Sequence, residues 1–236
     1  MAGTLYLIPT PLVEGVLSPL PEQTLAIIRQ LKVFVVERGK TARQFIKQTK
    51  TPIPLPEMTF FELNKRTAPN QLQSFLQPAL KEGLDIGVLS EAGCPGVADP
   101  GANLVNLAHE LGIEVVPLIG PSSILLALMA SGLNGQQFAF HGYIPIKNPE
   151  RKKALQDLER QSRKSNQTQI FIETPYRNDG LVSDMFSAFN AQTRLCIAAD
   201  LTAPEAYIKT KTVLDWKRQA PPRLHKRPAI FLILAS

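Results

Sequence analysis

Two loops rich in small residues, 91–101 and 120–123, constrain the fold of this chain more than any other feature. Each loop follows an apolar, strand-like run, at residues 85–90 and 113–118, and each leads into a helical pattern. Strand ends of this kind, one helix apart, are typical of open α/β sheets, which bind nucleotide-like ligands at the carboxyl ends of their strands. The segment therefore predicts a ligand site as well as a fold class.

The first half of the chain alternates strand-like runs with helical patterns. The helical patterns carry apolar residues at three- and four-residue spacing. This alternation predicts a mostly parallel sheet built from βαβ units. The expected strands are residues 4–9, 33–37, 59–63, 85–90 and 113–118, and the expected helices are residues 22–31, 41–47, 71–81 and 102–111.

The second half has a different order of elements. Its last strands follow one another through connections too short for crossover helices, which predicts antiparallel or mixed pairing. We therefore expect two α/β domains, residues 1–118 and 119–236, divided near Gly120-Pro121. The expected helices of the second domain are 123–131, 150–163 and 179–189, and its expected strands are 138–143, 169–173, 194–199, 207–213 and 229–234.

The composition is that of an ordinary globular protein. The 236 residues are 44% hydrophobic and 19% charged. The longest apolar stretches, 124–130 and 229–235, are too short to span a bilayer, and the N-terminal residues lack a signal-peptide pattern. The two cysteines, Cys94 and Cys196, form neither a disulfide framework nor a CxxC pair, so we expect no metal site and a reduced, cytoplasmic setting.

The loops have two interpretations that the residues alone leave open. The glycines and prolines of residues 91–101 let the backbone approach a ligand closely and expose amide groups at the next helix, but they also suit a simple tight turn. Ser122 or Ser123 is a good N-cap, which leaves the other hydroxyl available to a ligand. Neither GxGxxG nor GxxxxGK[ST] is present.

Six motifs occur along the chain in a recognisable order: LYLIPTP, SEAGCPGVADPG, VVPLIGPSS, GYIPIKNPERKK, FIETPYR and DLT. In this order they resemble the tetrapyrrole methylase superfamily, and most closely its branch of 16S ribosomal RNA cytidine 2′-O-methyltransferases. The resemblance implies two α/β domains with a cleft between them that binds S-adenosylmethionine, and it implies a homodimer. The implied activity is methylation of the ribose 2′-oxygen of a small-subunit cytidine.

The resemblance also assigns cofactor contacts. It places the loop after residue 90 against the cofactor, residues 122–124 beside its methionine and ribose parts, and residues 174–176 and 228–229 on its adenine side. The implied cofactor-binding residues are Pro9, Glu91, Ala92, Gly93, Cys94, Pro95, Val97, Ser122, Ser123, Ile124, Thr174, Tyr176, Pro228 and Ala229.

Three glutamates, Glu37, Glu62 and Glu173, lie at or near predicted strand ends, where a carboxylate could serve as a general base. Each also suits a structural or solvated role. By resemblance, Glu37 and Glu62 align with polar positions that face the cleft, so we select these two as the candidate catalytic residues.

The net charge of +6 is concentrated in two clusters, residues 147–164 and 223–227. A solvated helix face and a phosphate-binding surface explain these clusters about equally well. The aromatic and basic residues near 143–153 and 174–177 are of the kinds that RNA-binding surfaces use. The resemblance implies ribosomal RNA or the small ribosomal subunit as the partner, and we expect neither DNA nor a membrane. The candidate RNA-binding residues are Lys147, Arg151, Lys152, Lys153 and Arg177.

Two other functions remain open at this point. The segments on the cofactor side match the family pattern better than those on the substrate side, such as residues 12–15 and 37–40. A tetrapyrrole or other small-molecule methyltransferase is one alternative, although its branch favours a glycine-rich first loop where this chain has Pro9-Thr10-Pro11. A cofactor-binding protein that has lost catalysis is the other.

Overall fold

The computed structural model describes residues 2–17 and 19–236, and the chain divides into two compact units, Met1–Ser122 and Ser123–Ser236. The division falls after Ser122, whereas the boundary predicted from the sequence follows residue 118. Two hydrogen bonds hold the intervening residues to the first unit: the Leu118 amide donates to the Leu7 carbonyl, and the Thr24 hydroxyl donates to the Ile119 carbonyl. No helix in the described ranges is both long and apolar enough to cross a membrane.

The first unit is built on a five-stranded sheet in the order β3-β2-β4-β1-β5. All of its strand pairs are parallel, as the alternating pattern predicts. The strands are β1 (Leu5–Ile8), β2 (Val33–Val36), β3 (Thr59–Glu62), β4 (Ile86–Leu89) and β5 (Val115–Pro117). The helices are α1 (Glu22–Ile28), α2 (Gly39–Gln48), α3 (Leu72–Glu82) and α4 (Gly101–Glu110), with short 3-10 turns at Leu55–Glu57 and Pro69–Gln71.

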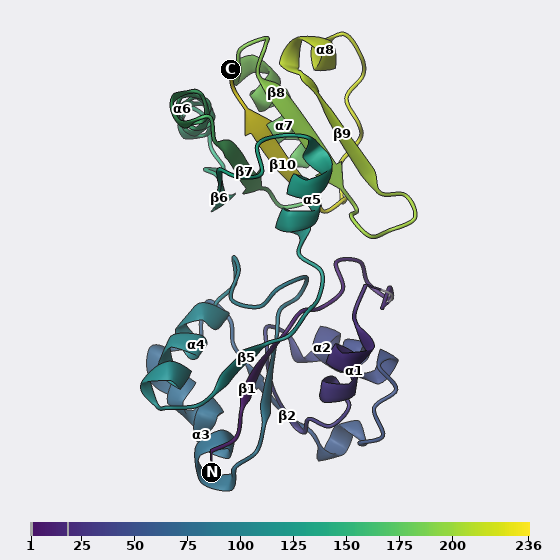
Figure 1. Cartoon of the computed structure of the whole chain (residues 1–236), viewed down its shortest axis with the longest axis vertical. Coiled ribbons are helices and arrows are strands. Elements are labelled where there is room, and N and C mark those ends of the chain that lie inside the picture. The colour runs from purple at the N-terminus through teal and green to yellow at the C-terminus, as the bar shows by residue number, and fades with distance from the viewer. Residues whose placement is uncertain (1, 18) are drawn as a thin grey trace. The chain divides into compact units, whose positions relative to one another are not determined.

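Helices cover both faces of this sheet (Figure 1). Successive side chains of a strand point to opposite faces. Accordingly, Phe34 packs into the cluster formed with α1 and α2, and Val35 packs into the cluster formed with α3 and α4. Every residue of β2 and β4 is buried, which is what a parallel sheet covered on both faces requires.

Two neighbouring parallel strands of this sheet are followed by helices on opposite faces. The strands β1 and β4 pair side by side, but β1 leads to α1 on one face and β4 leads to α4 on the other. The point between two such strands, at the carboxyl ends of the sheet, is the usual ligand position in sheets of this kind.

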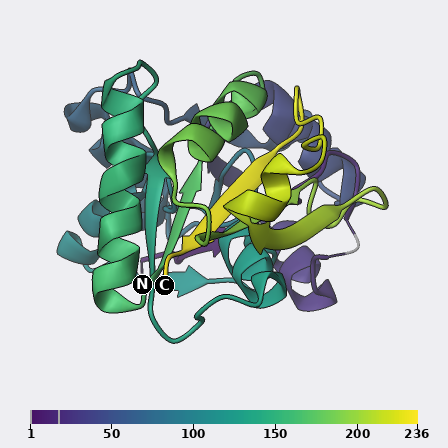
Figure 2. The same ribbon diagram turned by 90° about the horizontal axis from the view of Figure 1, so that it is seen from above.

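The second unit is built on a mixed sheet in the order β6-β7-β10-β8-β9. Only β6 and β7 pair in parallel, and the other pairs are antiparallel, so the predicted mixed pairing is confirmed. Figure 2 shows β10 running through the middle of this sheet. The strands are β6 (Phe138–Tyr143), β7 (Thr168–Ile172), β8 (Arg194–Ala199), β9 (Tyr207–Thr212) and β10 (Ala229–Leu234).

Helices also cover this second sheet. One core cluster joins α6 (Glu150–Ser165), α7 (Asn178–Ala188) and α8 (Val213–Lys217) to one face of the sheet, and α5 (Ser123–Ser131) packs on the other face. The sequence did not predict α8. Its five residues are too few to show a period, and it is started by the Thr212 side chain, which accepts a hydrogen bond from the Asp215 amide.

Candidate functional site

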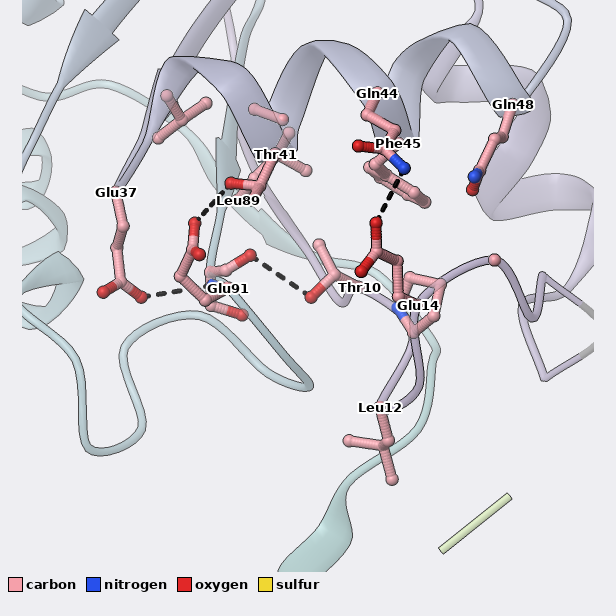
Figure 3. Close-up of a pocket in the computed structure, with 15 residues that line it drawn as sticks. Thr10, Leu12, Glu14, Glu37, Thr41, Gln44, Phe45, Gln48, Leu89 and Glu91 are labelled. Carbon is pink, nitrogen blue, oxygen red and sulfur yellow. Dashed lines mark hydrogen bonds between the residues drawn. The ribbon is translucent and has the colours of Figure 1, made fainter. Parts of the chain in front are cut away.

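A pocket of about 220 Å³ lies in the first unit where β1, β2 and β4 end (Figure 3). The residues after these strands form one side of it, and α2 forms the other. The pocket therefore lies at the carboxyl ends of the strands, where open α/β sheets bind their ligands. It is lined by Thr10, Pro11, Leu12, Glu14, Gly15, Val36, Glu37, Thr41, Ala42, Gln44, Phe45, Gln48, Leu89, Ser90 and Glu91.

Helix α2 brings five side chains to this pocket, from Thr41, Ala42, Gln44, Phe45 and Gln48. Residues three and four apart lie on the same face of a helix, so their spacing places them in one row. In Figure 3 this row faces the end of β4 and the loop after β1. A polar face of α2 thus lies opposite the carboxyl ends of the strands.

Three carboxylates share the pocket, and each already holds one local donor. The Glu37 Oε1 atom accepts from the Glu91 amide at 3.2 Å, and the Glu91 Oε1 atom accepts from the Thr41 hydroxyl at 2.7 Å. The Glu14 Oε1 atom accepts from the Gln44 side-chain amide at 2.7 Å. The second oxygen of each carboxylate accepts no hydrogen bond from any residue in the described part of the chain.

Glu37 has a pKa shifted by its surroundings. Burial raises its pKa above the ordinary glutamate value, because water no longer stabilises the charged form. The nearby carboxylates of Asp99 and Glu91 raise the pKa further, and the hydrogen bond from the Glu91 amide opposes the shift. A raised pKa in a pocket is a feature of proton-accepting side chains in active sites.

Glu62, the second candidate base, does not line this pocket. Its Oε1 atom accepts a hydrogen bond from the Gly39 amide at 2.8 Å, at the first residue of α2. A carboxylate in this position satisfies an unpaired amide and interacts favourably with the helix dipole. The structure therefore gives Glu62 a role in starting α2, and its catalytic role stays a prediction.

The cofactor-binding residues predicted in the first unit lie close together. Thr10, next to Pro9, and Gly93 exchange two backbone hydrogen bonds, at 2.9 and 3.1 Å. The Cys94 thiol lies 3.6 Å from the Pro121 carbonyl, and burial raises its pKa, so the thiol is not activated. The ends of β1, β4 and β5 therefore meet through these loops.

The loop after β4 uses part of its hydrogen-bonding capacity internally. The Asp99 carboxylate accepts from the amides of Gly96 and Gly101, each at 2.8 Å. These two amides are therefore not available to a ligand, although the sequence suggested that the amides at the start of this helix could be. The bonds instead fix the shape of the loop, and Val97 remains 46% exposed.

A second group of predicted cofactor residues lies at one end of the inner strands β7, β10 and β8 of the second sheet. Register places the end of β7 and the end of β8 beside the start of β10, with Ile172 opposite Ile230 and Ala199 opposite Ala229. The segment 174–177 also meets the segment before β10, because the Lys226 amide donates to the Pro175 carbonyl at 3.1 Å. Thr174, Tyr176, Pro228 and Ala229 all belong to these segments.

The residues at this end of the strands include polar atoms that are buried and unpaired. Glu173 Oε2 and Thr202 Oγ1 have no hydrogen-bond partner among the residues described, and neither do Arg177 Nε and Asn178 Oδ1. Native proteins rarely leave such atoms unsatisfied, and each case requires an explanation, such as a water or ligand. These residues therefore have hydrogen-bonding capacity left for a ligand.

The basic residues proposed for RNA divide into two groups. Lys147, Lys152 and Lys153 are exposed. Arg151 is only 9% exposed, and its guanidinium donates to the carbonyls of Pro145 and Ile146 and pairs with Asp184. These contacts hold the segment before α6, so Arg151 acts structurally rather than as part of an open basic surface.

Arg177 is also tied to the protein, through an ion pair of 2.6 Å with Glu173. Its side chain keeps 37% exposure. Arg177 therefore stays a candidate for RNA contact.

Sequence reasoning missed six polar residues of the pocket, Thr10, Glu14, Thr41, Gln44, Gln48 and Ser90. One signal was present, because the spacing of residues 41, 44 and 48 predicts a shared helix face. The sequence offered no reason for that face to lie against the ends of the strands. This arrangement depends on how α2 packs on the sheet.

A model of the tetrapyrrole (corrin/porphyrin) methylase family matches residues 4–215. Because this match covers most of the chain, the chain belongs to the tetrapyrrole methylase family. The resemblance inferred from the motifs is confirmed.

Curated relatives give the family a narrower context. The chain is 33% identical over 205 residues to ribosomal RNA small subunit methyltransferase I of Vibrio cholerae, covering 85% of this chain and 66% of the relative. The protein with the same name from Pseudomonas aeruginosa is 32% identical, with 85% and 67% covered. The chain thus spans about two thirds of the length of these relatives.

Solved structures share the fold. The methyltransferase CobJ matches with a TM-score of 0.65 at 18% identity, covering 100% of this chain and 95% of its own. Cobalt precorrin-4 methyltransferase matches with a TM-score of 0.63 at 15% identity, covering 98% and 94%. Identities this low establish the common architecture alone.

Proposed function

We propose that this chain is an S-adenosylmethionine-dependent methyltransferase that methylates small-subunit ribosomal RNA, at the ribose 2′-oxygen of a cytidine. The observation that carries the proposal is the pocket at the ends of β1, β2 and β4, which contains the half-buried carboxylate of Glu37 with one oxygen unoccupied. The names of the curated relatives support ribosomal RNA as the substrate class. They do not favour the tetrapyrrole alternative.

The residues present suit the proposed cofactor. Gly93 has a φ of +77°, and a Cβ atom there would lie 3.2 Å from the Leu12 side chain and 3.6 Å from the Pro121 carbonyl. The positive φ therefore favours glycine at this turn, which sets the course of the loop that holds the predicted cofactor contacts. In the second unit, the unpaired Glu173 Oε2 and Thr202 Oγ1 atoms supply acceptors for the amino and hydroxyl groups of a nucleoside.

In this proposal, Pro9, Gly93, Cys94 and Ser122 hold the cofactor in the first unit. In the second unit, taken by itself, the candidate cofactor contacts are residues 174–176 and 228–229, with Ser123 and Ile124 at the start of α5. S-adenosylmethionine supplies an electrophilic methyl group on a sulfonium ion when it is bound. The remaining chemistry is carried out by side chains of the chain.

Glu37 is the proposed proton acceptor. Its free Oε2 atom would accept a hydrogen bond from the ribose hydroxyl, orient it, and take its proton as the oxygen bonds to the methyl carbon. The bond from that carbon to sulfur would break in the same step and leave a neutral thioether. A general base of this kind contributes about 10²- to 10⁴-fold to a rate. Holding the reactants in alignment contributes the larger share, which the rigid strand ends favour.

The proposed partner is the small ribosomal subunit, contacted through the exposed Lys147, Lys152 and Lys153 together with Arg177. Lysines bind phosphates as point charges, and their contribution weakens as salt concentration rises. We further propose that the protein acts in the cytoplasm as a homodimer. Light scattering of the purified chain measures the oligomeric state directly.

Transfer of a labelled methyl group tests the proposal. Small ribosomal subunits from cells that lack this protein are incubated with the chain and labelled S-adenosylmethionine, and the modified nucleotide is then mapped. Label on the 2′-oxygen of one small-subunit cytidine is the expected result. Calorimetric titration with the cofactor runs in parallel, and binding without any label in RNA would favour a protein that has lost catalysis.

A further inference from the structure

The pocket of the first unit presents more hydrogen-bond acceptors than donors. The unoccupied groups include the second carboxylate oxygens of Glu14, Glu37 and Glu91 and the side-chain oxygen of Gln44. The Gln44 amide and the Thr41 hydroxyl are already donating to carboxylates. The remaining side-chain donors on this face of α2 are the second N–H of Gln44 and the amide of Gln48, which makes no hydrogen bond within the described chain.

This excess of acceptors argues against a phosphate as the occupant. Phosphate oxygens also accept hydrogen bonds, and three carboxylates would repel their charge. The Arg38 side chain does not compensate, because its Nε atom lies 4.0 Å from Glu91 Oε2 and the side chain is 77% exposed. A ligand that donates hydrogen bonds suits the pocket instead.

The other walls of the pocket are apolar. Leu12, Val36, Phe45 and Leu89 line it, and the last three belong to the buried core cluster on this face of the sheet. The volume of about 220 Å³ lies below the range of about 300–1,000 Å³ typical of pockets for drug-sized ligands. These dimensions suit a single planar ring with polar edges.

We propose that this pocket selects the base of the target nucleotide, and that the carboxylates of Glu14 and Glu91 read the exocyclic amine of cytosine. This inference rests on the proposed function and adds the residues that decide which nucleotide is accepted. Cytosine has a donor amine on its ring where uracil has an acceptor oxygen. A carboxylate can only accept, so it pairs with cytosine and repels the corresponding atom of uracil.

Gln48 does not make this distinction. A side-chain amide offers both a donor and an acceptor, and it can turn over to pair with either base. Selectivity therefore depends on the carboxylates, and Gln48 serves to hold the ring. Replacing a carboxylate by an amide of the same shape should remove selectivity while it preserves binding.

The test is a titration of the full chain, labelled with ¹⁵N, with cytidine and with uridine, followed through the side-chain amide signals of Gln44 and Gln48. We expect cytidine to bind at least about tenfold more tightly than uridine, as suits a hydrogen bond to a charged acceptor. In the double variant E14Q/E91Q the preference should fall below about threefold. The matched control is E57Q, an exposed glutamate of the same unit outside the pocket.

The single variants E14Q and E91Q are measured as well, with a thermal melt of each, so that loss of folding is recognised and selectivity is read from a folded variant. Equal binding of the two nucleosides by the unchanged chain would overturn the proposal, as would no binding of either or a preference that survives both substitutions. The label-transfer experiment on small subunits is independent of this titration. If label is transferred but the titration shows no preference for cytidine, only the role of this pocket in selecting the base is contradicted. If no label is transferred, the proposed function is contradicted.

Discussion

Glu37 and Glu173 occupy similar places in the two units, but their pKa values are shifted in opposite directions. Each follows a strand of its sheet, β2 in the first unit and β7 in the second. Burial tends to raise the pKa of both carboxyls, and Glu37 keeps a raised value. The pKa of Glu173 is lowered overall, because hydrogen bonds from Arg177 and the Thr174 amide outweigh its burial.

The difference comes from the available partners. Glu173 forms an ion pair of 2.6 Å with Arg177, and its side chain is 1% exposed. Glu37 accepts one backbone hydrogen bond and faces the carboxylates of Glu91 and Asp99. A carboxylate stabilised by an arginine suits a structural role, whereas a desolvated one among like charges is suited to accept a proton.

The substitution Glu37→Gln tests the catalytic side of this comparison and has the largest expected effect. We expect the rate of methyl transfer to fall about 10²- to 10⁴-fold, because the amide cannot accept the hydroxyl proton. Single-turnover transfer of label to small subunits measures the change, with Glu57→Gln as the control. A rate close to that of the unchanged chain would remove Glu37 from the mechanism.

The pH dependence of the rate of methyl transfer tests the same role of Glu37. A base must be deprotonated, so activity should be lost as the pH falls through the raised pKa of Glu37, at a higher pH than for an ordinary glutamate. An acid whose folded pKa is raised contributes stability at low pH and loses it as the pH rises. Glu37→Gln should therefore leave stability at neutral pH unchanged or slightly increased.

The substitution Glu173→Gln should have the opposite result. Loss of the charged partner of Arg177 should lower the free energy of unfolding by about 2 kcal/mol at neutral pH. Because the folded pKa of Glu173 is lowered, this contribution is present above its unfolded pKa and disappears as the pH falls through the folded value. The difference between the two chains should shrink on acidification.

Fluorescence of Trp216 follows this unfolding, since it is the one tryptophan of the sequence and is 1% exposed within the second unit. Titration with urea at two pH values gives the comparison. Equal stability of the variant and the unchanged chain at neutral pH would contradict a structural role for the ion pair.

A triple substitution of Lys147, Lys152 and Lys153 to glutamine tests whether the second unit contacts RNA. Affinity for ribosomal RNA should fall by about tenfold at low salt, and the slope of log K against log salt should become about 2–3 units shallower. Fluorescence anisotropy measures both quantities. Substitution of Lys32, Lys65 and Lys81, exposed residues of the first unit, removes the same charge and should have a smaller effect.

Glu62→Ala has the smallest expected effect and separates a structural glutamate from a catalytic one. Loss of the hydrogen bond to the Gly39 amide should cost about 1 kcal/mol and speed hydrogen exchange in the first turn of α2. The rate of methyl transfer should change less than about threefold once stability is accounted for. A hundredfold loss of rate in a folded variant would instead support its catalytic role.

Much of the fold follows from the sequence. The spans of α5, β6, β8 and β10 agree with those expected, and the predicted parallel and mixed sheets are both present. These features depend on local periodicity, on connection length and on glycine and proline at strand ends, all of which the chain displays directly. The family also follows from its motifs, and the match over residues 4–215 agrees.

The candidate site follows only in part. The sequence identified Glu37 and the loop after β4, because both lie next to recognisable strands. It also selected Glu62, whose carboxylate accepts a hydrogen bond from the first amide of α2, and Arg151, which forms a buried ion pair. A charged residue near a strand end has the same sequence pattern whether it faces a ligand or a backbone amide.

The sequence by itself determined the order of the elements, the kinds of sheet and the family. The tertiary structure alone decided which face of α2 lines the pocket, which of the three glutamates keeps an unoccupied oxygen there, and which pairs with arginine. The physical reason is that secondary structure depends on neighbours along the chain, whereas desolvation and hydrogen bonding depend on groups brought from distant positions. The properties of Glu37 and Glu173 are set by these distant groups.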